Sequence, residues 1–404
     1  MRIGILHYTA PPIVGGVESV LGHHARLMAE GGHQVRILAG RGKQTDSRVD
    51  FIHLPLADSR HPKILSIKAE LDRGNVPASF SGLVDEIANS LNNAMQGVET
   101  LIAHNVCSLH KNLPLTAALR RLWDQGCFPN LILWHHDLAW TTPRYRAELY
   151  SGFPWDLLCS DWPGAKQVVV SELRQRELAD LTGTQRERIS IVPNGIEALQ
   201  FLGFGAQTRE IVDLYNLLAA EPLLLLPVRI TPRKNIELAL RSLAAMSESL
   251  PHSVLVVTGP LGPHNPDNLN YFARLKSMRD ELALGQRACF LAEFSSQYLP
   301  DEVVAELYRL ADALLLPSRE EGFGIPILEA GISGIPIFCA DIPPLRSLAG
   351  EGAIYFSPDS EPEHVAGLIC GYLSNNPVYK MRLQVRRKYS WKQIYTHTIA
   401  PLLE

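Results

Sequence analysis

Two carboxylates, Glu321 and Glu329, are separated by seven residues in the stretch 320–331, which reads EEGFGIPILEAG. Glu329 falls within an otherwise apolar helical pattern, where a carboxylate is costly to bury unless it accepts strong hydrogen bonds. A vicinal diol, such as that of a ribose, would donate two. Glu321 precedes the pattern in a loop and can accept hydrogen bonds from a second polyol, such as a hexose. The pair indicates a site for a sugar-containing ligand.

Between these carboxylates lie Gly322, Phe323 and Gly324, followed by a helical pattern with Pro326 near its first turn. Glycines let the backbone approach a ligand closely, so their N–H groups can face a sugar or phosphates. The alternative is that the two glutamates are an ordinary loop residue and a helix residue that caps a neighbour. The Gly-Phe-Gly sequence beside paired acids favours the ligand site.

Two cations, Arg229 and Lys234, bracket a short loop directly after the apolar run 223–228. Arginine offers a planar fork and lysine a point charge, a combination suited to a diphosphate. The helix that follows adds the positive end of its dipole. Both cations could simply be solvated, but loops at the carboxyl ends of strands are where α/β sheets bind ligands. This position favours an anion site.

Another polar segment contains His135, His136 and Asp137 at the end of a predicted strand. A histidine there can donate a hydrogen bond to a substrate oxygen or phosphate, and an aspartate can orient it. A metal site is disfavoured because adjacent side chains of an extended chain point in different directions. Polar loop residues beside a core strand are an equally good explanation on this local evidence.

Gly15 and Gly16 separate the first predicted strand from a predicted helix. Here the backbone can approach a ligand, and the helix N-terminus presents unpaired N–H groups to an anion. The segment lacks a GxGxxG pattern, so a tight turn is the better explanation of this feature taken alone.

The elements that must position these residues are short apolar strands alternating with helical patterns, which is typical of doubly wound α/β domains. In the first half the strands are expected at Ile3–Tyr8, Gln34–Ala39, Phe51–Leu54, Thr100–His104, Asn130–Trp134, Gln167–Val170 and Ser190–Val192. In the second half they are expected at Leu223–Val228, Val254–Thr258, Ala288–Leu291, Ala313–Leu316, Pro336–Cys339 and Ala353–Phe356. The region 41–78 is expected to hold loops.

The turn Pro193-Asn194-Gly195 separates the two series of strands, and we place the domain boundary there. The chain has 404 residues, enough for two hydrophobic cores. The stretch 389–404 has a helical pattern, with Trp391, Ile394, Tyr395, Ile399 and Leu402 as its apolar residues. The charged run 386–388 before it is expected to be a solvated helix face.

Composition excludes several classes of protein. The formal net charge of −4 argues against a dedicated nucleic-acid binder. Six scattered cysteines predict reduced thiols, all six buried as small hydrophobic residues, and a cytoplasmic protein. The N-terminal apolar run is too short for a signal-peptide core, and apolar runs of strand length do not predict a spanning helix. An NAD oxidoreductase is disfavoured because the first strand–helix turn lacks GxGxxG.

Taken in order along the chain, these motifs resemble the retaining glycosyltransferases of family 4, which have the GT-B fold. The paired glutamates match the family's most specific motif, and Arg229 and Lys234 match its diphosphate clamp. Its Gly-Gly loop, its Pro-Asn-Gly junction and the helix that returns to the first domain are matched by Gly15-Gly16, Pro193–Gly195 and Tyr389-Ser390-Trp391. The resemblance implies two Rossmann-like domains facing each other across a cleft, with the first at 1–194, joined by helix 386–404, and the second at 195–385.

The resemblance also implies roles. Glu329 would bind the ribose and Glu321 the transferred sugar, while Arg229 and Lys234 would neutralise the leaving diphosphate. The active-site histidine would be His135 or His136, and we favour His136 because it precedes Asp137. The remaining residues expected to contact substrate are Gly15, Gly16, Asp137, Asn194, Gly322, Phe323, Gly324 and, through main-chain groups near the base, Phe294.

The expected substrates are a nucleotide sugar, with a UDP-hexose first and GDP-mannose next, and a glycan, lipid-linked or small-molecule acceptor. The family is metal-independent, so neither a metal nor another cofactor is expected, and membrane association is expected to be loose at most. A nucleotide-sugar 2-epimerase of similar architecture and a non-catalytic nucleotide-sugar-binding protein are the alternatives.

Overall fold

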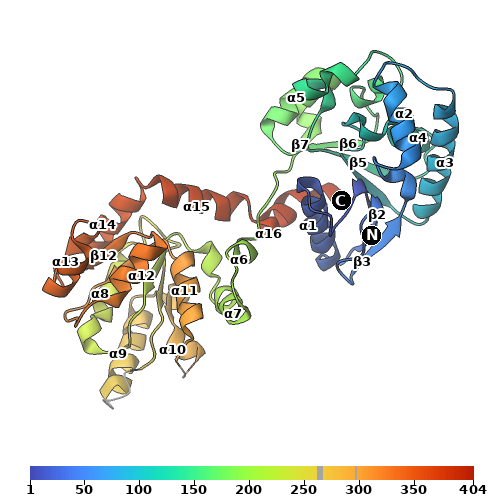
Figure 1. The fold of residues 1–404 in the computed structure, drawn as a ribbon. Helices are drawn as coiled ribbons and strands as arrows, with labels where there is room; N and C mark the ends of the chain where they lie inside the picture. Colours follow the sequence, from blue (N-terminus) through green and yellow to red (C-terminus); the bar gives the residue numbers. More distant parts are fainter. Residues whose placement is uncertain (262–266, 296–297) are drawn as a thin grey trace. The chain divides into compact units, whose positions relative to one another are not determined.

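The computed structural model describes residues 1–261, 267–295 and 298–404 (Figure 1). The chain forms two compact units, Met1–Gly195 with Tyr389–Glu404, and Ile196–Lys388. The first boundary lies one residue from the expected position, whereas the C-terminal segment joins the first unit at Tyr389 rather than at 386. Residues 386–388 stay in the second unit because helix α15 (Pro377–Lys388) continues through them. Arg387 and Lys388 are exposed as expected, whereas Arg386 is nearly buried and pairs with Asp312 at 2.7 Å, so the expectation of a solvated face is wrong for that residue.

The first unit is built on a parallel sheet in the order β3-β2-β1-β4-β5-β6-β7. Its strands are β1 (Arg2–Thr9), β2 (Gln34–Arg41), β3 (Val49–His53), β4 (Thr100–His104), β5 (Asn130–His135), β6 (Lys166–Val169) and β7 (Ile189–Ile191). Its longer helices are α1 (Gly16–Glu30), α2 (Pro62–Leu71), α3 (Ser79–Ala94), α4 (Leu113–Asp124) and α5 (Glu172–Thr182). The central strands are apolar along nearly their whole length because helices cover the parallel sheet.

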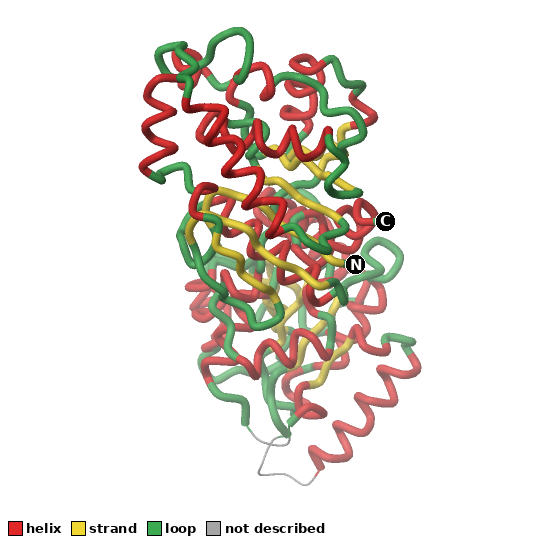
Figure 2. Tube along the Cα trace, turned by 90° about the vertical axis from the view of Figure 1, so that its right-hand side faces the viewer, coloured by secondary structure: helices red, strands yellow, loops and turns green. Residues whose placement is uncertain are grey.

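The second unit has a parallel sheet in the order β10-β9-β8-β11-β12-β13, which is the Rossmann arrangement. Its strands are β8 (Leu223–Leu226), β9 (Val254–Val257), β10 (Ala288–Phe290), β11 (Ala313–Leu316), β12 (Ile337–Ala340) and β13 (Ile354–Phe356). Besides α15, its helices are α6 (Ala198–Phe201), α7 (Ala206–Leu214), α8 (Ile236–Ala245), α9 (Asp267–Glu281), α10 (Leu291–Phe294), α11 (Asp301–Leu310), α12 (Ile325–Ser333), α13 (Pro343–Ala349) and α14 (Pro362–Leu373). Figure 2 shows the strands of both units in yellow and their helices in red.

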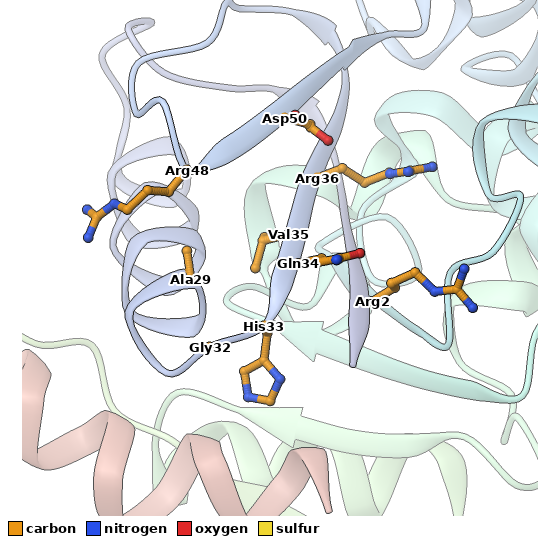
Figure 3. Close-up of a pocket in the computed structure, with 9 residues that line it drawn as sticks. All are labelled: Arg2, Ala29, Gly32, His33, Gln34, Val35, Arg36, Arg48 and Asp50. Carbon is orange, nitrogen blue, oxygen red and sulfur yellow. The ribbon is translucent and has the colours of Figure 1, made fainter.

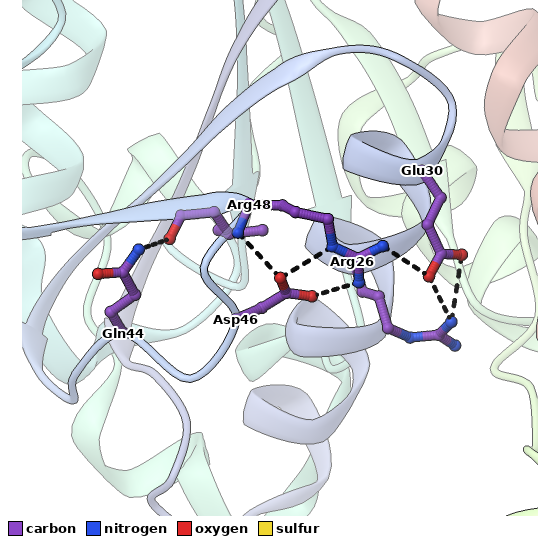
Figure 4. A network of polar contacts seen from close by, with 6 residues as sticks. Arg26, Glu30, Gln44, Asp46 and Arg48 are labelled. Atoms are coloured by element: carbon purple, nitrogen blue, oxygen red, sulfur yellow. Dashed lines mark hydrogen bonds and ion pairs between the residues drawn. The ribbon is translucent and has the colours of Figure 1, made fainter.

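Every predicted strand is present, but the region 41–78 is not only loop. It contains α2, whose N-terminus is set by His61 and Pro62 and whose apolar residues Ile64, Ile67 and Leu71 are buried. The loop before β3 is fastened to α1 by Arg48, which pairs with Asp46 at 2.6 Å and with Glu30 at 3.2 Å (Figure 4). All the predicted strands are therefore confirmed, and α2 is a helix that was not predicted in this region.

The C-terminal segment consists of α16 (Trp391–Ile394), a π turn (Tyr395–Ile399) and α17 (Ala400–Leu403). The π turn inserts an extra residue into the helical repeat. The expected apolar residue Leu402 is half-buried and packs against the core of the first unit, and Leu403 is buried beside it. Gly195 packs against this segment, because a Cβ there would lie 2.6 Å from Cδ2 of Trp391.

All six cysteines are free thiols, but only Cys107, Cys289 and Cys339 are buried. Cys127 is exposed, so the expectation of burial is wrong for that residue. Among the described residues, no helix is long and apolar enough to span a lipid bilayer.

Candidate functional site

Most of the sequence-predicted residues follow strands at, or next to, the topological switch point of a sheet. In the second unit this point lies between β8 and β11, and in the first between β1 and β4. Chain connections leave in opposite directions at such a point, which creates the crevice where open α/β sheets bind ligands.

In the second unit the structure brings Lys234 and Glu321 into direct contact. Nζ of Lys234 lies 2.6 Å from Oε1 of Glu321, and both side chains are more than nine-tenths buried. Burial lowers the pKa of Lys234, and the hydrogen bond from its ammonium to Glu321 only partly offsets this effect. Arg233 Nη1, 4.0 Å from Glu321, adds a second and more exposed positive charge.

Asn235 holds the loops of this pair in place. Its side-chain amide donates to the carbonyls of Pro317 at 3.1 Å and Pro358 at 2.9 Å, which joins the loops after β8, β11 and β13. Its own backbone is left-handed, with φ +52°, a conformation that asparagine tolerates better than most residues. Arg229, by contrast, is exposed on the loop after β8. Lys234 is thus pre-positioned, whereas Arg229 lies open to solvent in this unit.

Gly322, Phe323 and Gly324, the first three residues after Glu321, differ in how far the fold explains them. Gly324 has φ +101°, and a Cβ there would lie 2.6 Å from Leu345, so glycine is needed to fold the turn before α12. Gly322 has a negative φ, and an added Cβ would meet no atom within 4 Å. Phe323 is 56% exposed. The fold explains Gly324, but it leaves Gly322 and Phe323 without a packing role.

Glu329 lies on α12 and is half-buried. The hydroxyl of Tyr308, a buried residue of α11, donates to its Oε2 at 2.7 Å. Burial first, and then the Glu329 carboxylate, raise the pKa of Tyr308 well above its usual range, so the phenol stays a donor. Tyr308 satisfies one oxygen of Glu329 and was missed from sequence, because nothing in the chain order places it beside this glutamate.

In the first unit Gly15 precedes α1 in an extended conformation, and Gly16 is the first residue of the helix. A Cβ at Gly15 would lie 2.1 Å from the Glu18 carboxylate, whereas one at Gly16 would meet nothing within 4 Å. Glu18 accepts a hydrogen bond from Thr9 and lies 4.0 Å from Nε2 of His7. Its carboxylate therefore occupies the helix N-terminus, where an anionic ligand would compete with it.

The adjacent histidines His135 and His136 contact different partners. His135 Nε2 lies 2.8 Å from Oε1 of Gln167 on β6, so this ring is tied into the sheet. Burial lowers the pKa of His135 to about 4. The Asp137 carboxylate lies 3.7 Å from Arg174. The ring of His136 instead contacts His104, so the predicted orienting role of Asp137 is wrong.

His104 ends β4 and is completely buried, with Nδ1 at 3.0 Å from Nε2 of His136. Nδ1 of His7, on β1, donates to the His104 carbonyl at 2.7 Å. Neither residue was selected from sequence. The signal was present for His104, because it ends a predicted strand as His135 does, and carboxyl ends of parallel strands meet at one edge.

The remaining predicted residues are less informative. Asn194 is exposed next to the unit boundary, and Phe294 ends α10, half-buried against the second core. No ligand-binding geometry distinguishes either residue among the described parts of the chain.

Two further features do not belong to this site. A pocket of about 350 Å³ lies where β1 and β2 begin, and its guanidinium groups of Arg2 and Arg48 point in different directions (Figure 3). Asp72, His110 and Glu148 are close enough to hold a cation. Lys68 already supplies that charge, with Nζ at 2.7 Å from Asp72 and 3.0 Å from Glu148.

Comparison with known families covers both units. Residues 14–198 match the family model described as Glycosyltransferase Family 4, and residues 210–389 match the model described as Glycosyl transferases group 1. Two consecutive Rossmann-like sheets with these matches define a glycosyltransferase of the GT-B fold. The chain belongs to glycosyltransferase family 4.

Among similar proteins is D-inositol 3-phosphate glycosyltransferase of Nocardia farcinica, 30% identical over 47% of this chain and 42% of the relative. O-antigen chain mannosyltransferase RfbU of Salmonella typhimurium is 28% identical over 63% of this chain and 61% of its own. Mannosylglucosylglycerate synthase of Thermotoga maritima is 24% identical over 83% and 80%, respectively. The chain thus spans about half the length of the first two relatives.

Proposed function

We propose that the protein transfers a hexose from a nucleoside-diphosphate sugar to a hydroxyl group of a glycan, lipid-linked or small-molecule acceptor, with retention of anomeric configuration. The observation that carries this proposal is the buried Lys234–Glu321 pair at the switch point between β8 and β11. In the absence of donor the two charges neutralise each other. With donor bound, Lys234 binds the diphosphate and Glu321 the hydroxyls of the sugar.

The proposed reaction breaks the bond between the anomeric carbon and the donor phosphate oxygen. The acceptor oxygen forms its bond to that carbon on the same face, and the acceptor proton passes to the leaving phosphate. Negative charge develops on the diphosphate, and Lys234 with Arg229 stabilises it. Gly322 lets main-chain N–H groups approach the donor, and Glu329 holds the ribose. Positioning and charge stabilisation then supply the catalysis, without a protein base or a metal.

A UDP-hexose remains our first candidate for the donor, with GDP-mannose next. The names of the Salmonella and Thermotoga relatives refer to mannosyl groups, which supports testing GDP-mannose alongside. The setting we propose is cytoplasmic, with at most loose contact to a membrane that carries a lipid-linked acceptor.

The test is a panel of UDP-glucose, UDP-galactose, UDP-N-acetylglucosamine and GDP-mannose, screened by thermal shift on the full chain. A donor at 100 times its Kd should stabilise the folded state by about 2.7 kcal/mol. Product analysis with that donor then separates glycoside formation from release of a free epimer or from binding without turnover.

Variants locate the site. Lys234→Ala and Glu321→Ala should lose both the shift and the transfer, with circular dichroism confirming that each is folded. Lys380→Ala and Glu363→Ala, exposed on α15 and α14, are matched controls that should behave like the parent protein. Near-normal transfer by both site variants would refute the proposal.

A further inference from the structure

The contact between His104 and His136 has a direction that the structure allows to be assigned. Nδ1 of His104 and Nε2 of His136 lie 3.0 Å apart. A neutral imidazole has one N–H donor and one acceptor nitrogen, so one ring must donate and the other accept. The choice determines which nitrogen of His136 carries its proton.

Both rings are neutral at physiological pH. Burial lowers the pKa of His136 to about 3 and that of His104 well below its ordinary value, and neighbouring histidines add to both effects. The aromatic groups that face His104 are His24, at 5.4 Å between ring centroids, and Trp134, stacked at 5.3 Å. Protonating either imidazole would place a charge among these rings.

The other nitrogen of His104 decides the direction. Among the described residues Nε2 of His104 is buried and has no hydrogen-bond partner. A proton there would leave an N–H group buried without an acceptor, which is unfavourable because the lost hydrogen bond to water is not replaced. A proton on Nδ1 is used in the contact with His136 and leaves only a lone pair against the aromatic rings. The second arrangement is therefore favoured.

We infer that His104 donates this hydrogen bond and so holds the single proton of His136 on Nδ1, which makes His136 a hydrogen-bond donor of fixed tautomer toward the substrate. His104 is then a positioning residue rather than a catalytic one. The ligand role of His136 rests on the proposed function, whereas the tautomer does not.

The main chain of His136 is also held in place at the end of β4. Oδ1 of Asn105 accepts from the backbone N–H groups of His136 at 2.7 Å and Asp137 at 3.2 Å. Asn105 has φ +56°, in the left-handed region. The backbone of His136 is thus fixed by Asn105 and its ring by His104, both at the end of β4.

The direct test is the ring ¹⁵N spectrum of histidine-labelled full-length protein, with the His136 signals identified by their loss in His136→Ala. We expect Nδ1 of His136 to give the shift of a protonated nitrogen and Nε2 that of an unprotonated one. In His104→Phe, which keeps a ring against Trp134 but removes the donor, this preference should disappear. A protonated Nε2 in the wild-type protein would overturn the inference.

Kinetics test the positioning role. His104→Phe should lower kcat/KM for transfer by about three- to tenfold, the value of one neutral hydrogen bond. The loss should fall on kcat if the bond strengthens in the transition state. His104→Asn, whose amide can donate in place of Nδ1, should recover most of it.

Unchanged kcat/KM in a folded His104→Phe protein would refute the positioning role. If that variant does not fold, the wild-type spectrum alone decides the direction of the bond. Normal turnover in His136→Ala would instead contradict the proposed function at this residue and leave the tautomer standing.

Discussion

Lys234 and Glu321 belong to loops that follow different strands, β8 and β11, yet their charged atoms lie 2.6 Å apart and both side chains are almost wholly buried. Neither charge is stable in such surroundings without a partner. When a donor binds, its diphosphate can take the place of Glu321 as the partner of Lys234, and its sugar hydroxyls can take the place of Lys234 as the partner of Glu321. The ion pair therefore stabilises the free protein, and we propose that both residues bind the donor in the complex.

The first prediction concerns the stability of this pair. Lys234→Met should lower the free energy of unfolding of the second unit by about 3 kcal/mol, because breaking a buried ion pair leaves one charge uncompensated. Lys234→Met with Glu321→Leu should recover most of that loss, while donor binding stays absent.

Spectroscopy can separate the units in this experiment. All six tryptophans of the chain lie in the first unit, namely Trp123, Trp134, Trp140, Trp155, Trp162 and Trp391. Tryptophan fluorescence therefore follows the first unit, and far-ultraviolet circular dichroism follows both. Additive losses in the double variant would show that the two charges are not energetically coupled.

A second prediction follows from the contact between Tyr308 and Glu329. Tyr308→Phe removes a hydrogen bond to a carboxylate, worth about 1.5–3 kcal/mol, and frees Glu329 to leave its ribose-binding position. We expect the KM for donor to rise about tenfold or more, with a smaller change in kcat. Tyr372→Phe, at an exposed position of α14, is the control.

A deoxyribose donor shows whether the effect passes through the sugar. Removing a ribose hydroxyl should cost the parent enzyme affinity but should cost the Glu329→Gln and Tyr308→Phe variants much less. An equal penalty in all three proteins would mean that Glu329 does not bind the ribose.

The strands and the residues at their carboxyl ends were predictable because each is a local pattern of apolar residues followed by a loop. Lys234 and Glu321 were found in this way, and the sheet order brings them together. Which side chain meets which across strands was not predictable. His104 and Tyr308 owe their roles to neighbours 32 and 21 positions away, respectively.

The errors also have physical causes. Asp137 follows His136 in the chain, but its carboxylate lies near Arg174 while the histidine ring turns to His104. Arg386 belongs to a run of charged residues, but its contact with Asp312 buries it, while Arg387 and Lys388 stay exposed. Adjacent residues share a backbone, but their side chains need not share partners.

A third prediction concerns pH. Burial lowers the pKa of His24 to about 3, whereas an unfolded histidine has a pKa near 6.5. Below pH 6.5 the unfolded state binds a proton that the folded state does not, so stability falls as pH decreases toward 3. One such histidine lowers the free energy of unfolding by about 2 kcal/mol between pH 7 and pH 5.

His24→Phe should remove this share of the pH dependence, and it also removes two buried nitrogens that have no partner among the described residues. Urea unfolding followed by tryptophan fluorescence measures it, since His24 packs against Trp134 and Trp391. His397→Phe, exposed in the same unit, is the matched control. An unaltered slope of stability against pH in His24→Phe would contradict the assignment.

The fourth prediction separates the two glycines of the loop between Glu321 and Glu329. Gly324→Ala should destabilise the second unit by about 1–3 kcal/mol, because its φ of +101° is strained for alanine and the new Cβ would lie 2.6 Å from Leu345. Gly322→Ala should leave the stability within about 0.5 kcal/mol of the parent, because the new Cβ meets no atom of the protein.

If the proposed site is correct, substitution of Gly322 should reduce donor affinity even though it leaves stability nearly unchanged. A methyl group there would stand between the main chain and the donor, so Gly322→Ala should weaken donor binding at unchanged melting temperature. Calorimetric titration with the donor measures this, and Gly331→Ala, on the exposed face of α12 with no atom within 4 Å of its new Cβ, controls for the added methyl group. Equal donor affinity in both variants would place the donor away from this loop, because only a ligand gives glycine a role at position 322.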